Sequence, residues 1–287
     1  MEIVSGGLTD NISSEQSSST FSSIYDEEVI SLALTCIGNS IKNQEEFNTW
    51  SIQEYKLIGG SITTVVDSVL ANLIYGRGEK SGKSKTNKGE VRLKAQAIYA
   101  LGCSLRGNRL AQAQFNKSYG GVFLLKLMED YSHDFKILGK LMVLASDMLD
   151  EYELLIVMSE SLLSSETQDN SIKDAINLEL QIMQDAITSF TGQPWCKSSL
   201  KLLSSQSTQT EELALTTLNT MLKYCQDTYK KGTVDYGKMI RVIEGVEKRW
   251  RADKEMDREW KRDMLKLSEG VKGGGGGERD EAGKWAF

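Results

Sequence analysis

The stretch Gly78–Ser84 is the part of the sequence that comes nearest to a site for chemistry. It reads Gly-Glu-Lys-Ser-Gly-Lys-Ser, close to a phosphate-binding loop, in which backbone N–H groups and a lysine hold a nucleotide. That loop needs four residues between its first glycine and the Gly-Lys-Ser triplet, whereas Gly78 leaves three and Gly76 leaves five. Because this count sets where the N–H groups point, we interpret the stretch as a surface loop without a nucleotide site.

Histidine and cysteine offer little for catalysis or metal binding. The one histidine, His133, lies between acidic residues and a serine in what we expect to be an exposed turn. The cysteines are widely spaced without a Cys-x-x-Cys pair, which predicts neither a disulfide framework nor a zinc cluster; they are Cys36, Cys103, Cys196 and Cys225. The first two lie in apolar helical runs and should be buried thiols. We predict no catalytic residue, metal site or cofactor, whereas Asn11 and Asn116 fit the glycosylation sequon.

The composition narrows the class of protein. The chain has 287 residues, a net charge of −6, a single proline and a pI near 5.2. Such an acidic chain lacks the basic face that a nucleic-acid binder needs. No apolar run approaches the roughly 18 residues of a membrane-spanning helix. The lone proline favours long helices over a sandwich or barrel, which would need many turns.

The chain divides into three parts. Residues 1–27 form a Ser-rich leader that we expect to be flexible, and Met1–Thr20 lacks the apolar stretch of a secretory signal. Residues 28–267 carry apolar side chains at steps of three and four, which is the pattern of amphipathic helices. A polar insert at residues 76–90 interrupts them, and residues 268–287 form a glycine-rich tail.

The periodicity predicts a succession of helices and no strand. Thr208–Glu211 has the pattern of a capping box, in which side chains satisfy free N–H groups at a helix start. The last helix is long and charged, and its Trp250 and Trp260 should pack on a neighbouring helix. Beyond residue 90 the longer predicted helices are Leu93–Arg106, Lys136–Leu155, Ile172–Ser189, Trp195–Leu203, Glu211–Lys231 and Tyr236–Leu267.

One pattern occurs twice. Ile37–Lys42 and Leu101–Arg106 both read apolar-Gly-x-Ser-apolar-basic, and each is followed by a phenylalanine, a Gly-Gly pair and an apolar helix. A repeat of helical units at this scale indicates a solenoid. We therefore predict an all-α fold of the armadillo type, a right-handed superhelix of helical repeats. Its second repeat should place Leu101, Phe115, Val122 and Leu125 in the core.

The segment Ala97–Leu127 resembles one repeat of a known family. It reads Ala-Ile-Tyr-Ala-Leu-Gly-Cys-Ser-Leu-Arg, then Ala-Gln-Ala-Gln-Phe at 111–115, then Gly120-Gly121 before an apolar helix. In this it is similar to the armadillo-repeat nucleotide exchange factors of seventy-kilodalton heat-shock chaperones. The likeness extends over roughly residues 28–250. It implies a monomeric co-chaperone without enzymatic activity that binds the nucleotide-binding domain of a chaperone, and no nucleic acid or membrane.

Two later segments, Trp195-Cys196 and Cys225–Tyr229, are similar to the C-terminal half of the animal endoplasmic-reticulum member. That member serves the lumenal chaperone BiP, so the resemblance implies promotion of ADP release in the lumen, in support of protein folding and transport. Two alternatives stay open. The cytosolic relative is favoured by the missing signal in Met1–Thr20. A general armadillo scaffold for extended peptides would need a ladder of Trp and Asn, which the repeats lack.

The contacts with the chaperone should come from polar and charged groups at the ends of the repeat helices. Each of these groups could instead only solvate the end of its helix, and the sequence does not separate this role from a contact with the chaperone. The candidates are Lys42 and Asn43 in the first repeat, Arg106, Asn108 and Arg109 in the second, and Asp147, Asp150 and Glu151 in the third.

Overall fold

The computed structural model of the chain describes residues 27–41, 55–56, 62–64, 66–67, 69, 88–163 and 170–273. The predicted all-α, armadillo-like class is confirmed. The only strands among the described residues are the antiparallel two-residue strands β1 (Tyr55–Lys56) and β2 (Ile62–Thr63).

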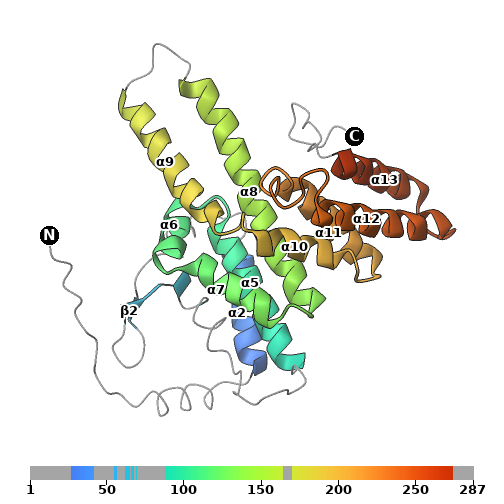
Figure 1. Cartoon of the computed structure of the whole chain (residues 1–287). Helices are drawn as coiled ribbons and strands as arrows, with labels where there is room; N and C mark the ends of the chain where they lie inside the picture. The colour runs from blue at the N-terminus through green and yellow to red at the C-terminus, as the bar shows by residue number, and fades with distance from the viewer. Residues whose placement is uncertain are drawn as a thin grey trace.

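The described helices carry the labels of Figure 1. They are α2 (Glu27–Ile41), α5 (Lys88–Leu105), α6 (Arg109–Lys117), α7 (Gly120–Asp130), α8 (Phe135–Leu163), α9 (Asn170–Thr188), α10 (Gln193–Leu202), α11 (Thr208–Met221), α12 (Val234–Ala252) and α13 (Arg258–Gly273). Figure 1 shows α2 and α5 in the lower part of the molecule, α12 and α13 on the right, α8 between them, and α9 beside α6.

Helices α2, α5, α8, α11 and α13 form a row in which each packs on the next. From α5 onward, the helices of this row are separated in the chain by one or two others, and α6 packs on α9 in the same way. Such stacking of corresponding helices from successive segments is the arrangement of a solenoid. At the start of the row, α2 packs closely on α5 at Gly38. A Cβ at this position would lie only 2.6 Å from the Tyr99 ring, so a larger residue would not fit without a shift. The Tyr99 hydroxyl also donates a hydrogen bond to Asn39 at 2.9 Å. The far halves of α8 and α9 project together beyond this row (Figure 1).

One continuous apolar core connects the repeats. The rings of Phe115, Phe190 and Trp195 lie in series, with centroids 6.1 Å and 5.1 Å apart. The prediction that Leu101 and Phe115 are core residues is confirmed, since both are 0% exposed. The prediction that Val122 is a core residue is wrong. Its side chain is 63% exposed, because α7 packs on the core through its opposite face. Leu125 is only partly buried and packs on the edge of the core.

The capping box predicted at Thr208–Glu211 does not form. The residue at the N-cap is Ser207, and its side chain makes no capping hydrogen bond. The Glu211 carboxylate points to α12, where it accepts a hydrogen bond of 2.8 Å from Trp250 Nε1 and pairs with Arg249. A tertiary partner has replaced the local one.

The single helix predicted for Tyr236–Leu267 is two helices, α12 and α13. Asp253 ends the first, and its Oδ1 accepts from the backbone N–H groups of Glu255 and Met256. Asp257 then starts the second by accepting from the N–H of Trp260 at 2.8 Å. The break lets the Trp250 and Trp260 rings meet edge to face, 5.4 Å apart.

Cys196 and Cys225 form a disulfide, which corrects the expectation of no disulfide framework. The helix predicted for Glu211–Lys231 ends at Met221, and the chain turns back so that the two Cα atoms lie 5.9 Å apart. The Tyr229 hydroxyl donates to the Cys196 carbonyl at 2.6 Å, and burial raises the pKa of this phenol. The expectation of buried free thiols is confirmed for Cys103 and wrong for Cys36, which is exposed.

The predicted division of the chain stays a prediction. Most of the leader, insert and tail, including the loop at residues 78–84, lies outside the described residues. Two ends differ: α5 already begins at Lys88, inside the predicted insert, and α13 continues to Gly273, inside the predicted tail. No described helix has the length and apolar content needed to cross a bilayer. The described part also holds no group of three or more metal-binding side chains.

Candidate functional site

The turn between α5 and α6 lies against the middle of α8. Gly107 adopts φ +65°, a conformation open to glycine, and its N–H donates to the Glu151 carboxylate at 2.8 Å. Asn108 caps α6 by accepting from the Ala111 N–H at 3.1 Å. Because the Asn108 side chain is buried and engaged in this way, it positions the turn and does not reach the surface.

Two ion pairs join this turn to α8. Arg106 Nε donates to Asp147 at 2.6 Å, and each side chain is 34% exposed. Arg109 pairs with Glu151 at 3.2 Å, with both side chains less than a quarter exposed. Burial raises the pKa of the Asp147 carboxyl, although the charge of Arg106 opposes this shift. Both pairs lie at the edge of the packed core, partly exposed to solvent.

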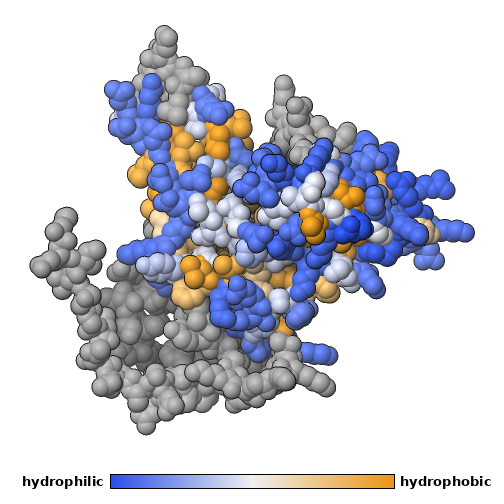
Figure 2. Space-filling model, viewed as in Figure 1, coloured by the Kyte–Doolittle hydropathy of each residue, from blue (hydrophilic) through white to orange (hydrophobic). Residues whose placement is uncertain are grey.

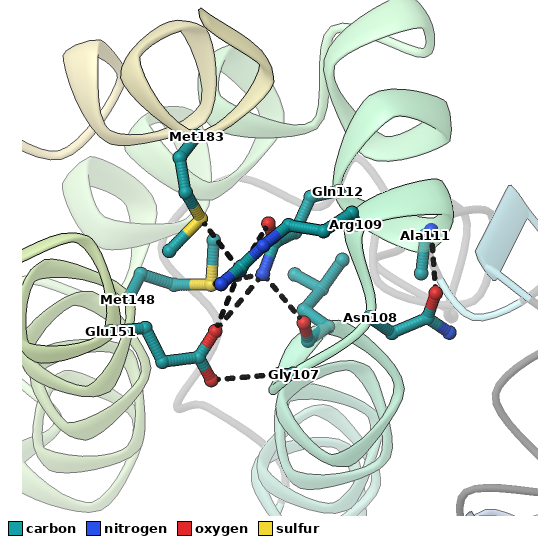
Figure 3. Close-up of polar contacts among 9 residues, drawn as sticks. Gly107, Asn108, Arg109, Ala111, Gln112, Met148, Glu151 and Met183 are labelled. Atoms are coloured by element: carbon teal, nitrogen blue, oxygen red, sulfur yellow. Dashed lines mark hydrogen bonds and ion pairs between the residues drawn. The ribbon is translucent and has the colours of Figure 1, made fainter. Parts of the chain in front are cut away.

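Gln112 contacts both Arg109 and Glu151 (Figure 3). Its side chain is 0% exposed, and its Nε2 donates to the Leu105 carbonyl at 2.8 Å and to Glu151 at 3.1 Å. Arg109 donates to Gln112 Oε1 and to the Met183 sulfur, each at 3.0 Å. The network therefore joins α5, α6, α8 and α9. Gln112 was not among the predicted site residues, although it lies in the Ala-Gln-x-x-Phe segment that carries the resemblance.

The structure thus brings five of the eight candidates together, namely Arg106, Asn108, Arg109, Asp147 and Glu151. Asp150 faces the other side of α8, where Thr220 donates to it at 3.5 Å. Lys42 and Asn43 lie outside the described residues. We call Arg106, Arg109, Asp147 and Glu151 the charged cluster.

Beyond the charged cluster, the same face of α8 becomes apolar. Leu154 and Met158 continue the spacing of Asp147 and Glu151 and are 58% and 53% exposed. Val157 and Leu162 flank them and are exposed as well. Figure 2 shows apolar surface on the projecting α8–α9 pair. The name apolar stripe is used for Leu154, Val157, Met158 and Leu162.

Three other residues singled out in the sequence have clear positions. His133 is exposed in the turn between α7 and α8, as expected, with Lys201 Nζ 3.5 Å from its Nδ1. Asn116 lies on α6, and its Nδ2 donates to the Ile182 carbonyl at 3.3 Å, so glycosylation there would break a contact with α9. Asn11 lies outside the described residues, and both glycosylation sites stay predictions.

The SIL1/FES1/HPBP1 C-terminal domain family matches residues 85–260, which is more than half of the chain. The chain therefore belongs to this family, whose members are nucleotide exchange factors for seventy-kilodalton heat-shock chaperones. They are co-chaperones and not enzymes in the usual sense, and they include lumenal and cytosolic members. No curated protein and no solved structure matches the chain. At the level of the family, the resemblance of Ala97–Leu127 is confirmed.

Proposed function

We propose that this chain is an exchange factor of the lumenal chaperone BiP and acts as a monomer in the endoplasmic reticulum. The observation that supports the lumenal address is the Cys196–Cys225 disulfide. Disulfides persist in oxidising compartments such as this lumen, whereas cytosolic thiols are kept reduced. The same two cysteines lie in the segments that resemble the lumenal member.

The proposed mechanism is a shift in the conformational equilibrium of the chaperone. If the chain binds the open, nucleotide-free form more tightly than the closed ADP form, linkage requires that it weaken ADP binding by the same factor. Equal affinity for the two forms would change nothing, however tight the complex. The chaperone then supplies the nucleotide pocket, and this chain supplies a surface that fits one of its conformations.

We place the chaperone contact on the charged cluster and the apolar stripe of α8. Interfaces combine an apolar centre with polar groups that orient the partner. Here Asp147 and Glu151 lie on the same helix face as Leu154 and Met158. The two carboxylates are partly covered by the α5–α6 turn, whereas Leu154 and Met158 are more than half exposed. Asp150 faces α11 and is not part of this surface, whereas Asn108 would act by holding the α5–α6 turn in place.

The proposed function is tested by stopped-flow release of a fluorescent ADP analogue from BiP and, in parallel, from a cytosolic seventy-kilodalton chaperone. We expect a many-fold acceleration for BiP and a smaller one for the cytosolic protein. A larger effect on the cytosolic chaperone would contradict the lumenal assignment. No acceleration of either would leave a general armadillo scaffold for peptides.

A charge swap tests the charged cluster. The double variant Arg106→Asp/Asp147→Arg keeps an internal ion pair but reverses the charges that a partner meets. Since both side chains are one third exposed, we expect an unfolding free energy within about 1 kcal/mol of wild type. The acceleration of ADP release should fall at least about tenfold, as for a lost charged contact. Full acceleration would make the pair purely structural.

A second variant tests the apolar stripe. Met158→Asp places a charge in its centre without disturbing the core, since Met158 is 53% exposed. It should reduce the acceleration of ADP release at least about fivefold, because an interface core excludes charge. The matched control is Val234→Asp, an exposed apolar residue at the start of α12, which should accelerate release as wild type does. Equal losses in the two variants would remove the apolar stripe from the contact.

A further inference from the structure

A hollow of about 390 Å³ lies where the end of α12 meets α13. Its lining is Arg251, Arg258, Lys261, Arg262, Leu265, Lys266 and Glu269. Figure 1 shows α13 at the opposite end of the molecule from α6, so the hollow is separate from the charged cluster. Figure 2 shows this end as largely hydrophilic.

The hollow concentrates positive charge in a chain whose net charge is −6. Five of its seven lining residues are cationic, and one is acidic. Within the described part of the chain, the side chains of Arg251, Arg258 and Lys266 make no ion pair or hydrogen bond. Lys261 Nζ donates to the Asp253 carbonyl at 2.5 Å and makes no ion pair with a carboxylate within the described part of the chain.

Among the described cations that line the hollow, only Arg262 has carboxylate partners, which are Glu259 at 3.4 Å and Asp263 at 3.2 Å. Its neighbours one turn away on α13, Arg258 and Lys266, carry the same sign of charge. Like charges at this spacing destabilise a helix by a few tenths of a kcal/mol for each pair, on the order of 0.3 kcal/mol. Glu259 and Asp263 partly offset the repulsion between Arg262 and these two neighbours, and a bound anion would reduce it further.

We propose that this hollow binds an acidic segment of a partner polypeptide. From Arg258 to Lys266 the cations extend over about 12 Å of helix, at about 1.5 Å per residue. That is longer than one phosphate or carboxylate group, and it suits several carboxylates along an extended chain. Guanidinium groups bind carboxylates through two parallel hydrogen bonds, and Leu265 among them offers an apolar contact. The inference goes beyond the proposed exchange activity and does not rest on it.

The test uses a fluorescein-labelled nonapeptide in which one leucine is flanked by four glutamates on each side. Its fluorescence anisotropy is titrated with the full chain. We expect saturable binding that weakens at least about tenfold between low and moderate salt, since exposed charges are screened. The same peptide with glutamine in place of glutamate should not bind. Binding of the glutamine peptide with equal affinity would overturn the proposal.

The double variant Arg258→Glu/Lys266→Glu should weaken binding of the glutamate peptide at least about tenfold. Its matched control, Lys230→Glu/Lys231→Glu, makes the same change of net charge at exposed positions between α11 and α12 and should bind as wild type does. Equal weakening in both variants would overturn the site, because only net charge would then matter. Tighter binding of inorganic tripolyphosphate or of phosphatidylserine vesicles than of the peptide would overturn the choice of an acidic polypeptide.

Discussion

Glu211 holds a carboxylate between α11 and α12, where its side chain is only 3% exposed. A buried carboxylate is unfavourable unless donors surround it. Here one oxygen accepts from Trp250 Nε1 and the other pairs with Arg249. Glu211 thereby links α11 to α12. Removing its side chain would leave the buried indole N–H of Trp250 without an acceptor.

We predict that Glu211→Ala lowers the free energy of unfolding by about 2 kcal/mol, because the buried Trp250 N–H loses its acceptor, whereas the half-exposed Arg249 can be solvated. Urea denaturation followed by circular dichroism measures it. The control is Glu259→Ala, since Glu259 is 79% exposed and pairs with Arg262 on the surface. That change should cost less than about 0.5 kcal/mol. Similar values for the two variants would contradict a structural role for Glu211.

At the scale of elements, the Gly-Gly pair of the repeat explains how α6 and α7 pack. Tyr119, just before α7, has φ +54°, and the next two residues, both glycines, lie against neighbouring side chains. A Cβ on Gly120 would overlap the Phe115 ring, and one on Gly121 would overlap the Ser189 side chain. The pair is needed because α7 begins directly on the aromatic core.

Gly120→Ala should therefore destabilise the protein by about 2 kcal/mol, as overpacking of a filled core does. The Phe115 ring cannot yield easily, because it is fully buried and stacked on Phe190. Gly270→Ala is the control within a helix, since nothing lies within 4 Å of its added Cβ. It should raise stability by about 0.5–1 kcal/mol. Thermal melts of the two variants and of the wild type measure these changes in stability. An unchanged melting temperature for Gly120→Ala would contradict the packing argument.

For the whole molecule, the disulfide closes a loop of the chain with a separation of 29 residues. It ties α10 to the segment after α11, which has left its helix. In the chain-entropy account a bridge of this span stabilises the folded state by roughly 3–4 kcal/mol. The C-terminal repeats should thus be the part of the protein that depends most on an oxidising environment.

The double variant Cys196→Ala/Cys225→Ala should lose about 3–4 kcal/mol of unfolding free energy in urea. Dithiothreitol should bring the wild type to nearly the same value and leave the variant unchanged. Cys36→Ala is the control, because Cys36 is an exposed free thiol, and it should behave as wild type does. A wild type insensitive to dithiothreitol would argue against the bridge and would remove the support for a lumenal address.

The class of fold and the family could be predicted from the residues alone. Apolar side chains recurring at three and four residues, with one proline, require helices whatever their neighbours are, and Leu101 and Phe115 followed directly from that pattern. Arg106 could also be selected from its place at the end of a predicted helix, whereas Asp147 lies in the middle of α8 and not at the helix end where the candidates were expected. Arg106 and Asp147 were predicted as separate contact residues, and the sequence did not indicate that they form an ion pair with each other.

Which groups pair follows from the packing of the helices and not from the local sequence pattern. Arg106 meets Asp147 across 41 positions, Trp250 meets Glu211 across 39, and Cys196 meets Cys225 across 29. Helical periodicity depends on contacts within about four residues, so it contains no information on partners that packing brings together. Glu211 failed as a capping residue for this reason: a buried donor on α12 offered its carboxylate a better partner than the N–H groups of its own helix.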